Sequence, residues 1–413
     1  MTRTQPLFNA ACLAGALLLL VSGALGWLSS PLSGWLKGYA LVPFGDLPMG
    51  PPTLRLLSFG MTASVLGAVG MVFFRVERIR RIVGLLALTV GIGFFYHLAF
   101  LNPHWFWPLL DQNQQYQRIF TFSSKYLPAN QGREPVFEAN LNGDDFGARI
   151  TSSVYFLGLG WGLAMAGAVV LIATTRRNRW AVGVLLGLFV AAVIPFLWAD
   201  HLRERGDAAL GQGQPARAIQ DYRTARRIDS YMDFNLNVHL HFGEAYDRLG
   251  RSDDADIHLY RADRLSREGR TPEAAFEYEK AIESGSDGSR RVGQAGLAWL
   301  YVLYGLQQFG QDEKEKSILL FQKAVAVDPS QIQGDYYTAK AYFDLGRYSE
   351  AIAVNLRLLR SVGNSIILAN VHANLGDCYY RQREYAVAKK YYARSMELDR
   401  YLNIRALKSL VGP

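Results

Sequence analysis

The sequence predicts an all-α protein in two parts: an N-terminal bundle of about five transmembrane helices and a C-terminal α-solenoid. Three observations lead to this fold class. Long apolar stretches recur through residues 1–198, helical segments of similar pattern recur through residues 199–413, and the charged residues divide unequally between the two halves. We therefore expect two domains that meet near residue 198.

The distribution of charge argues against nucleic-acid binding. Residues 1–200 contain 14 of the 44 Lys and Arg residues but only 8 of the 36 Asp and Glu residues, so this half carries most of the net charge of +8. Its basic residues stand in short runs beside apolar segments, which is typical of orientation signals for membrane insertion. Because the second half is nearly balanced in charge, we expect no nucleic-acid partner.

No motif in the sequence predicts catalysis, a cofactor or a metal site. The two cysteines, Cys12 and Cys378, have no neighbouring partner, which excludes zinc ribbons, covalent haem and a disulfide framework. No nucleotide-binding loop, nucleophile elbow or metal-ligand set occurs at a meaningful spacing. The sequence therefore predicts a non-enzymatic protein, without catalytic, cofactor-binding or metal-binding residues.

Five apolar stretches approach the ~20 residues that cross a hydrocarbon core of ~30 Å as a helix. Backbone groups in hydrocarbon must be satisfied within their own segment, so we expect helices rather than strands. The predicted spans are 8–29, 53–74, 82–101, 151–174 and 180–198. Ser22-Gly23-Ala24 resembles a signal-peptidase site, and cleavage there would leave four spans.

Arginine clusters predict the orientation of these spans. Eight of the 14 basic residues in this half lie at three places: Arg3, the run Arg75–Arg81 and the run Arg176–Arg179. All three places fall on one side of the membrane if each segment crosses once, and the positive-inside rule assigns that side to the cytoplasm. We therefore expect a protein of the bacterial inner membrane with a cytoplasmic N-terminus and a periplasmic C-terminal domain.

Two further features of the N-terminal half predict contacts. Small residues at four-residue spacing let helices pack closely, either within the bundle or against another membrane subunit. They are Gly60, Ser64 and Ala68 in the second span and Gly158, Gly162 and Ala166 in the fourth. Residues 103–150 are expected to form an outer loop, with an aromatic cluster at 104–107 on the membrane surface and a short amphipathic helix over 111–126 lying on the outer surface.

From about residue 199 the chain is self-similar with a period near 34 residues. Small residues stand where two antiparallel helices would approach most closely, and large residues stand beside them. Representative positions are Gly206, Ala218 and Tyr222 in the first copy and Gly376, Ala388 and Tyr392 in the sixth. The pattern resembles the tetratricopeptide-repeat family across the whole C-terminal half.

The resemblance implies a solenoid of about six helix pairs, one of them degenerate. The helix that contains residues 255–262 can be the second helix of one copy or the first helix of the next. Residues 401–410 match the capping helix that covers the last apolar face of a solenoid. Neither Gly nor Pro interrupts Trp198–His201, so the fifth span and the first repeat helix are expected to form one continuous helix.

The resemblance also implies where partner proteins bind. In this family, certain positions of each first helix line a concave groove that accepts an extended peptide or a helix. Carried onto this sequence, these positions give the predicted partner-binding residues Asn237, Glu244, Trp299, Tyr336, Lys340, Phe343, Asn370, Asp377 and Tyr380. Trp299 and Tyr336 are the expected anchors, because aromatic side chains dominate binding hot spots.

The leading prediction is a membrane-anchored scaffold or assembly factor that recruits partner proteins in the cell envelope. It looks like the anchored repeat proteins that serve polysaccharide export, pilus assembly or cytochrome assembly. The alternative is an accessory subunit of a membrane enzyme or transporter, which docks through its transmembrane bundle and the 103–150 loop. The expected partners are proteins in the groove, a second membrane subunit on the small-residue faces, and the lipid bilayer.

Overall fold

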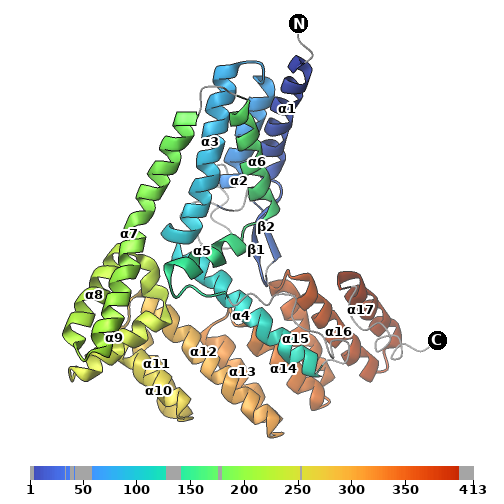
Figure 1. Cartoon of the computed structure of the whole chain (residues 1–413). Helices are drawn as coiled ribbons and strands as arrows, with labels where there is room; N and C mark the ends of the chain where they lie inside the picture. Colours follow the sequence, from blue (N-terminus) through green and yellow to red (C-terminus); the bar gives the residue numbers. More distant parts are fainter. Residues whose placement is uncertain are drawn as a thin grey trace.

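The computed structural model describes residues 4–32, 34–37, 41, 58–126, 141–174, 179–251 and 254–399. In this part of the chain an elongated apolar bundle stands over a curved array of helix pairs, and the chain begins at the end of the bundle that is away from the array (Figure 1). Arg3, the pair Arg176–Arg177 and the predicted capping helix 401–410 lie outside the described residues.

The elements follow one another in chain order through both bodies. The bundle and its connections are α1 (Thr4–Ser22), β1 (Gly26–Ser30), β2 (Gly34–Lys37), α2 (Phe59–Val72), α3 (Glu77–Tyr96), the π-helical turn η3 (His97–Leu101), α4 (Pro103–Tyr126), α5 (Phe146–Tyr155), α6 (Leu159–Ala173) and α7 (Arg179–Gly211). The array continues with α8 (Pro215–Ile228), the 3-10 turn η5 (Ser230–Phe234), α9 (Leu236–Arg248), α10 (Ala255–Arg267), α11 (Thr271–Ser284), α12 (Asp287–Gly310), α13 (Lys314–Val327), α14 (Ile332–Asp344), α15 (Tyr348–Ser361), α16 (Ser365–Arg381) and α17 (Tyr385–Leu398).

Each predicted span contains a helix, but two helices of the described residues are long and apolar enough to cross a membrane. They are Glu77–Leu101 and Trp180–Gly211, whereas the apolar helices Phe59–Val72 and Leu159–Ala173, and the apolar part Asn9–Ser22 of α1, are shorter. A helix of 14 or 15 residues is roughly 21–23 Å long, which is less than the ~30 Å of a hydrocarbon core. Five full-length spans are therefore not confirmed.

The apolar runs are shortened because the chain leaves the helix early. The sequence predicts one helix over 8–29, but α1 ends at Ser22 and the following residues pair as the antiparallel hairpin β1–β2. The run 151–174 is broken between α5 and α6. The edge of the hairpin inserts at this break, where the Gly158 amide donates to the Trp27 carbonyl over 2.8 Å. Trp27 and Leu28 of the hairpin and Phe156 at the break are buried.

Small residues bring α1, α2 and α6 into backbone contact. A Cβ on Gly67 would lie 2.3 Å from the Leu20 nitrogen, and one on Gly167 would lie 2.6 Å from the Gly15 carbonyl oxygen. The buried small faces are Gly60, Ala63, Gly67 and Gly70 on α2 and Gly160, Ala164, Gly167 and Ala168 on α6. Of the predicted small-residue ridges, Gly60 is buried within the bundle, whereas Ala68 and Ala166 are exposed, so their contact with another membrane subunit stays a prediction.

The two helices of a repeat also approach closely where a glycine of one helix faces an aromatic ring of the other. A Cβ added at Gly206, Gly305 or Gly376 would lie 2.5 Å from an aromatic ring atom of Tyr222, Phe321 or Tyr392, respectively. Each of these rings belongs to the second helix of the pair. The expected close approach of paired helices is confirmed at these positions.

The turns within the helix pairs show which helix is shared between two repeat copies. Each pair turns through a residue of positive φ, and in the described residues these are Gly213, Gly250, Gly269, Asp312, Gly346 and Arg383. Helix α10 has such a turn on both sides. It is therefore the second helix of one pair and the first helix of the next, so one helix fewer is needed than in six separate pairs. Helix α7 continues without a break from the bundle into the first pair, which confirms the predicted continuous helix.

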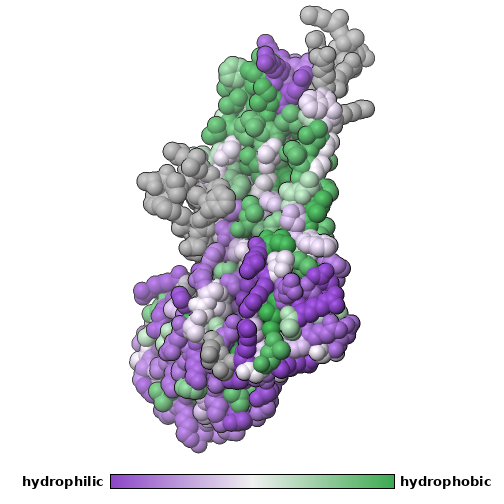
Figure 2. Space-filling model, turned by 90° about the vertical axis from the view of Figure 1, so that its left-hand side faces the viewer, coloured by the Kyte–Doolittle hydropathy of each residue, from purple (hydrophilic) through white to green (hydrophobic). Residues whose placement is uncertain are grey.

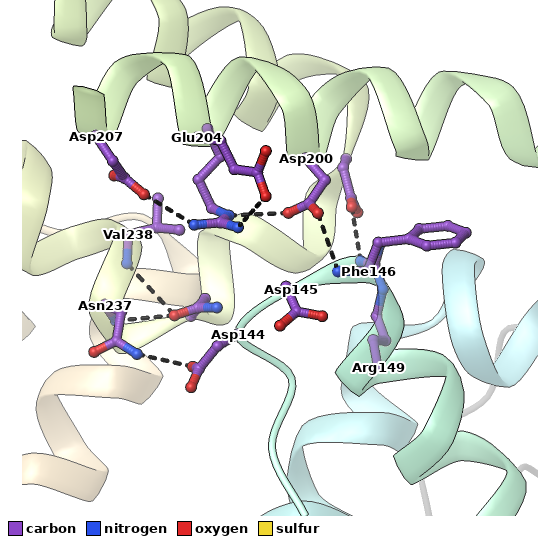
Figure 3. A network of polar contacts seen from close by, with 12 residues as sticks. Asp144, Asp145, Phe146, Arg149, Asp200, Glu204, Asp207, Asn237 and Val238 are labelled. Atoms are coloured by element: carbon purple, nitrogen blue, oxygen red, sulfur yellow. Dashed lines mark hydrogen bonds and ion pairs between the residues drawn. The ribbon is translucent and has the colours of Figure 1, made fainter. Parts of the chain in front are cut away.

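A polar junction fixes the bundle to the first repeats (Figure 3). The Arg149 guanidinium contacts the Asp229 carboxylate at 2.7 Å, with side chains that are 5% and 0% exposed. The Phe146 amide donates to Asp200 over 3.3 Å, and the Asn237 side chain donates to Asp144 over 2.8 Å. Burial raises the pKa of Asp229, so the carboxylate depends on the adjacent guanidinium to remain charged.

We predict that Asp229→Ala lowers the free energy of unfolding by about 3–5 kcal/mol, because it leaves the Arg149 charge buried without a partner. Denaturant unfolding in mild detergent measures the loss. The control Glu397→Ala removes the acidic side of a solvent-exposed ion pair with Arg394 and should cost less than about 0.5 kcal/mol. Equal losses in the two variants would contradict the buried junction.

Candidate partner-binding groove

The array divides into a first repeat block (α7–α11) and a second repeat block (α12–α17). Helix α4 crosses the first helices of the second block, as Figure 1 shows. We name as the groove the face that α12, α14 and α16 present to α4. The predicted helix over 111–126 is present as part of α4, but it packs against the repeats and does not lie on the outer surface as predicted. The aromatic cluster is also largely internal, since Trp105 and Phe106 are buried.

Three side chains of α4 at four-residue intervals contact aromatic rings of the groove. The guanidinium carbon of Arg118 lies 3.6 Å from the centre of the Trp299 ring. The ring of Phe122 lies 4.4 Å from that of Tyr337, and the ring of Tyr126 meets Phe309 edge-on at 5.6 Å. Residues four apart lie on one face of a helix, so these contacts form a single stripe.

Polar contacts fix the register of α4 in the groove. The Ile332 amide donates to Gln115 Oε1 over 3.1 Å, and Gln115 Nε2 donates to the Ser330 carbonyl over 3.2 Å. Near the other end of the helix, the side-chain amide of Asn370 donates to Ser123 Oγ over 3.3 Å. Burial raises the pKa of Asp111 to about 6, although a hydrogen bond from Gln115 opposes the shift. Both ends of the buried stripe are therefore held by directional bonds.

The structure places three of the predicted partner-binding residues beneath α4. Tyr336 is 2% exposed and Asn370 is 0% exposed, and Trp299 is half-buried under the Arg118 guanidinium. Trp299 and Tyr336 are therefore not open anchors, which corrects the prediction. They serve the chain's own helix, because the same aromatic surface that suits a partner also suits α4.

Four other predicted residues gather at an open pocket where α4 ends. Lys340, Phe343, Asp377 and Tyr380 line a space of about 420 Å³, and Tyr126 of α4 forms part of the wall. Lys340 pairs with Asp344 and lies over the Phe343 ring, with 5.3 Å between its Nζ and the ring centre.

The charge state of the pocket is set by burial. Burial raises the pKa of Asp377 to about 6, and the Tyr392 hydroxyl donates to its carboxylate over 2.6 Å. Arg381 and Lys340 supply positive charge at the same wall. The pocket thus combines aromatic walls with both signs of charge, which suits a protein segment that has apolar and polar side chains.

The two remaining predicted residues lie in the first repeat block, away from this pocket. Asn237 lies in the first turn of α9 and donates a hydrogen bond to Asp144 of the junction, while Glu244 forms an ion pair with Arg248 on the same helix. The structure therefore does not bring the nine residues together at one site. Asn237 fixes the bundle to the repeats, and Glu244 stands on a separate surface.

Sequence reasoning missed Tyr126, Asn355 and Arg381 of the pocket. Asn355 lies on α15, which is a second helix, and the family pattern concerns first helices only. Tyr126 lies outside the repeats altogether. The four-residue spacing of Arg118, Phe122 and Tyr126 was the available signal, but spacing alone does not say which surface a stripe covers.

The fold and groove define a solenoid of antiparallel helix pairs, and comparisons with known proteins agree. Family models described as tetratricopeptide repeat match residues 305–366 and 369–401. The chain therefore contains tetratricopeptide repeats, which are protein-interaction modules. No curated protein matches the chain.

Among solved structures, the chain is similar to MamA, with 19% identity, a TM-score of 0.26, and coverage of 47% of this chain and 94% of that chain. It is similar to PilF of Pseudomonas aeruginosa, with 20% identity, a TM-score of 0.25 and coverage of 52% and 88%. It is also similar to YrrB, described as a TPR protein with an unusual peptide-binding site, with 14% identity, a TM-score of 0.26 and coverage of 50% and 89%.

We predict that Phe122→Ala destabilises the protein by about 3–5 kcal/mol, because a buried ring between α4 and the groove is removed. Phe343→Ala, at the open pocket, should cost about 1 kcal/mol or less. Thermal unfolding of the two purified variants compares the sites with the same chemical change. If Phe343→Ala were the more damaging of the two, α4 would not fill the groove as described.

Proposed function

We propose that this chain is a non-enzymatic scaffold, anchored in a membrane by its N-terminal helices, that recruits a partner protein at the open end of the groove. The pocket at the end of α4 carries the proposal. Its walls come from α4 and from the repeats, and its side chains take no part in the polar junction between the bundle and the first repeats. A segment bound there would be held at a fixed place relative to the membrane.

The surface of the bundle supports the membrane anchor. Figure 2 shows an apolar surface between a polar end and the polar array of repeats. On α7 the large exposed apolar side chains cover about half of the helix circumference, whereas Val193, Phe196 and Ala199 are buried on the other side. The exposed ones are Trp180, Val184, Leu186, Leu188, Val190, Ile194, Leu197 and Trp198. So large an apolar surface exposed to water is rare in soluble monomers, and a bilayer would cover it.

The position of the arginines supports a periplasmic repeat array in the bacterial inner membrane. Arg75 and Arg78 are exposed at the turn between α2 and α3, which lies at the end of the bundle away from the repeats (Figure 1). By the positive-inside rule this end would face the cytoplasm. The repeats would then lie on the opposite side, in the cell envelope.

We predict that alkaline phosphatase fused after Gly412 is active in a bacterial host, because the enzyme folds only outside the cytoplasm. The same enzyme fused within the turn at Arg75 should be inactive. A cytoplasmic reporter at each position should show the reverse. Activity at Arg75 combined with inactivity at Gly412 would contradict the orientation.

The pocket favours a protein segment that buries an aromatic or aliphatic side chain. Rings of Tyr126, Phe343 and Tyr380 supply the apolar walls. Lys340, Asp377 and Arg381 supply charged groups at the same pocket. Binding there would combine a buried anchor with polar contacts at the rim.

We predict that the double change Phe343→Ala with Tyr380→Ala weakens capture of the partner by about thirtyfold or more, since hot-spot aromatics contribute ~2 kcal/mol or more. Quantitative affinity purification in mild detergent, with identification of the proteins that co-purify, measures capture. The matched control Phe276→Ala removes an exposed aromatic of α11 in the first block and should leave capture unchanged. Undiminished capture by the double variant would instead favour an accessory subunit that docks through its bundle.

A further inference from the structure

The groove recognises a helix by a regular spacing of side chains. Arg118, Phe122 and Tyr126 contact Trp299, Tyr337 and Phe309, respectively. At 1.5 Å per residue the first and last of the three are about 12 Å apart along one face of the helix. The groove therefore accepts a cation followed by two aromatic rings at four-residue intervals.

Helix α4 does not satisfy the whole groove. Tyr126, the residue at which α4 ends, forms one wall of a pocket whose other walls include Phe343 and Tyr380. This pocket of about 420 Å³ leaves part of the aromatic surface open beyond α4.

We propose that the groove is an exchange site, in which an amphipathic helix of the partner protein replaces the C-terminal half of α4. The partner helix has the same cation–aromatic–aromatic spacing and extends past the position of Tyr126 into the pocket. There it gains contacts with Phe343 and Tyr380. This inference rests on the proposed recruitment function and adds the shape and chemistry of the partner.

The tether of α4 explains why the extra contacts are needed. An intramolecular segment competes at an effective concentration that is typically millimolar, so a free helix with identical contacts is excluded at micromolar concentration. A partner that engages the pocket first holds its remaining residues beside α4. Weakening α4 should therefore open the groove to a free helix.

The probe is a fluorescent synthetic peptide of residues 111–126, added to the full chain in detergent. The weakened variant carries Arg118→Ala, Phe122→Ala and Tyr126→Ala, which remove the whole stripe. We expect it to bind the probe at least about thirtyfold more tightly than the wild-type chain does, as measured by fluorescence anisotropy. A probe with the same three changes should not bind.

The control variant Thr121→Ala alters the exposed face of α4 and should bind the probe no better than the wild type. If the triple variant does not fold, the milder variant Arg118→Ala, which keeps both aromatic contacts, is tested in its place and should also bind the probe more tightly than the wild type does. Failure of a weakened variant to bind the probe, in a chain that keeps its helical melting transition, would show that α4 is a permanent part of the fold and would overturn the exchange.

The two proposals fail separately. If probe uptake fails while the Phe343–Tyr380 double variant still loses its partner, the exchange falls and recruitment at the pocket stands. If uptake succeeds while capture is insensitive to the double variant, the groove accepts helices but the partner docks elsewhere, so the exchange of α4 for that partner falls.

Discussion

The burial of α4 against the repeats is the contact on which the rest of the structure depends. It places the rings of Phe122 and Tyr126 among those of Phe309 and Tyr337, in an apolar cluster that neither the bundle nor the repeats could complete alone. Removing this helix would expose a row of aromatic side chains to water, at roughly 25 cal/mol per Å² of apolar surface. The groove that a repeat protein commonly leaves open is therefore largely part of this protein's core.

The other connections make the bundle and the repeats one mechanical unit. Helix α7 runs from one to the other, the buried Arg149–Asp229 pair locks the first repeats, and the Leu32 carbonyl accepts hydrogen bonds from the amides of Gly363 and Asn364 at the second block. Contacts with both repeat blocks oppose rotation about α7. A partner bound at the pocket would thus have a fixed distance and direction from the bundle, which is the property that a scaffold requires.

How much of this arrangement the sequence predicts depends on how far apart in the sequence the interacting residues lie. The repeats are predictable because Gly376 and Tyr392 meet within one helix pair, at a spacing that recurs. The end of α1 at Ser22 is not predictable, because an apolar run has the same sequence pattern whether lipid, a hairpin or another helix covers it. Nor is the partner of α4 predictable, because Phe122 and Tyr337 meet only after more than 200 residues of intervening chain. Periodicity identifies a helix face, and tertiary packing selects its partner.

Hydrogen exchange of the α4 backbone amides tests this account most directly. If α4 fills the groove, amides of residues 113–126 exchange as slowly as those of α14, and Tyr337→Ala accelerates their exchange without affecting the amides of α3. Tyr337 is remote in sequence, so this result would report the tertiary contact itself. Rapid exchange throughout 113–126 in the wild-type protein, at the rate of an isolated helix in water, would contradict the account.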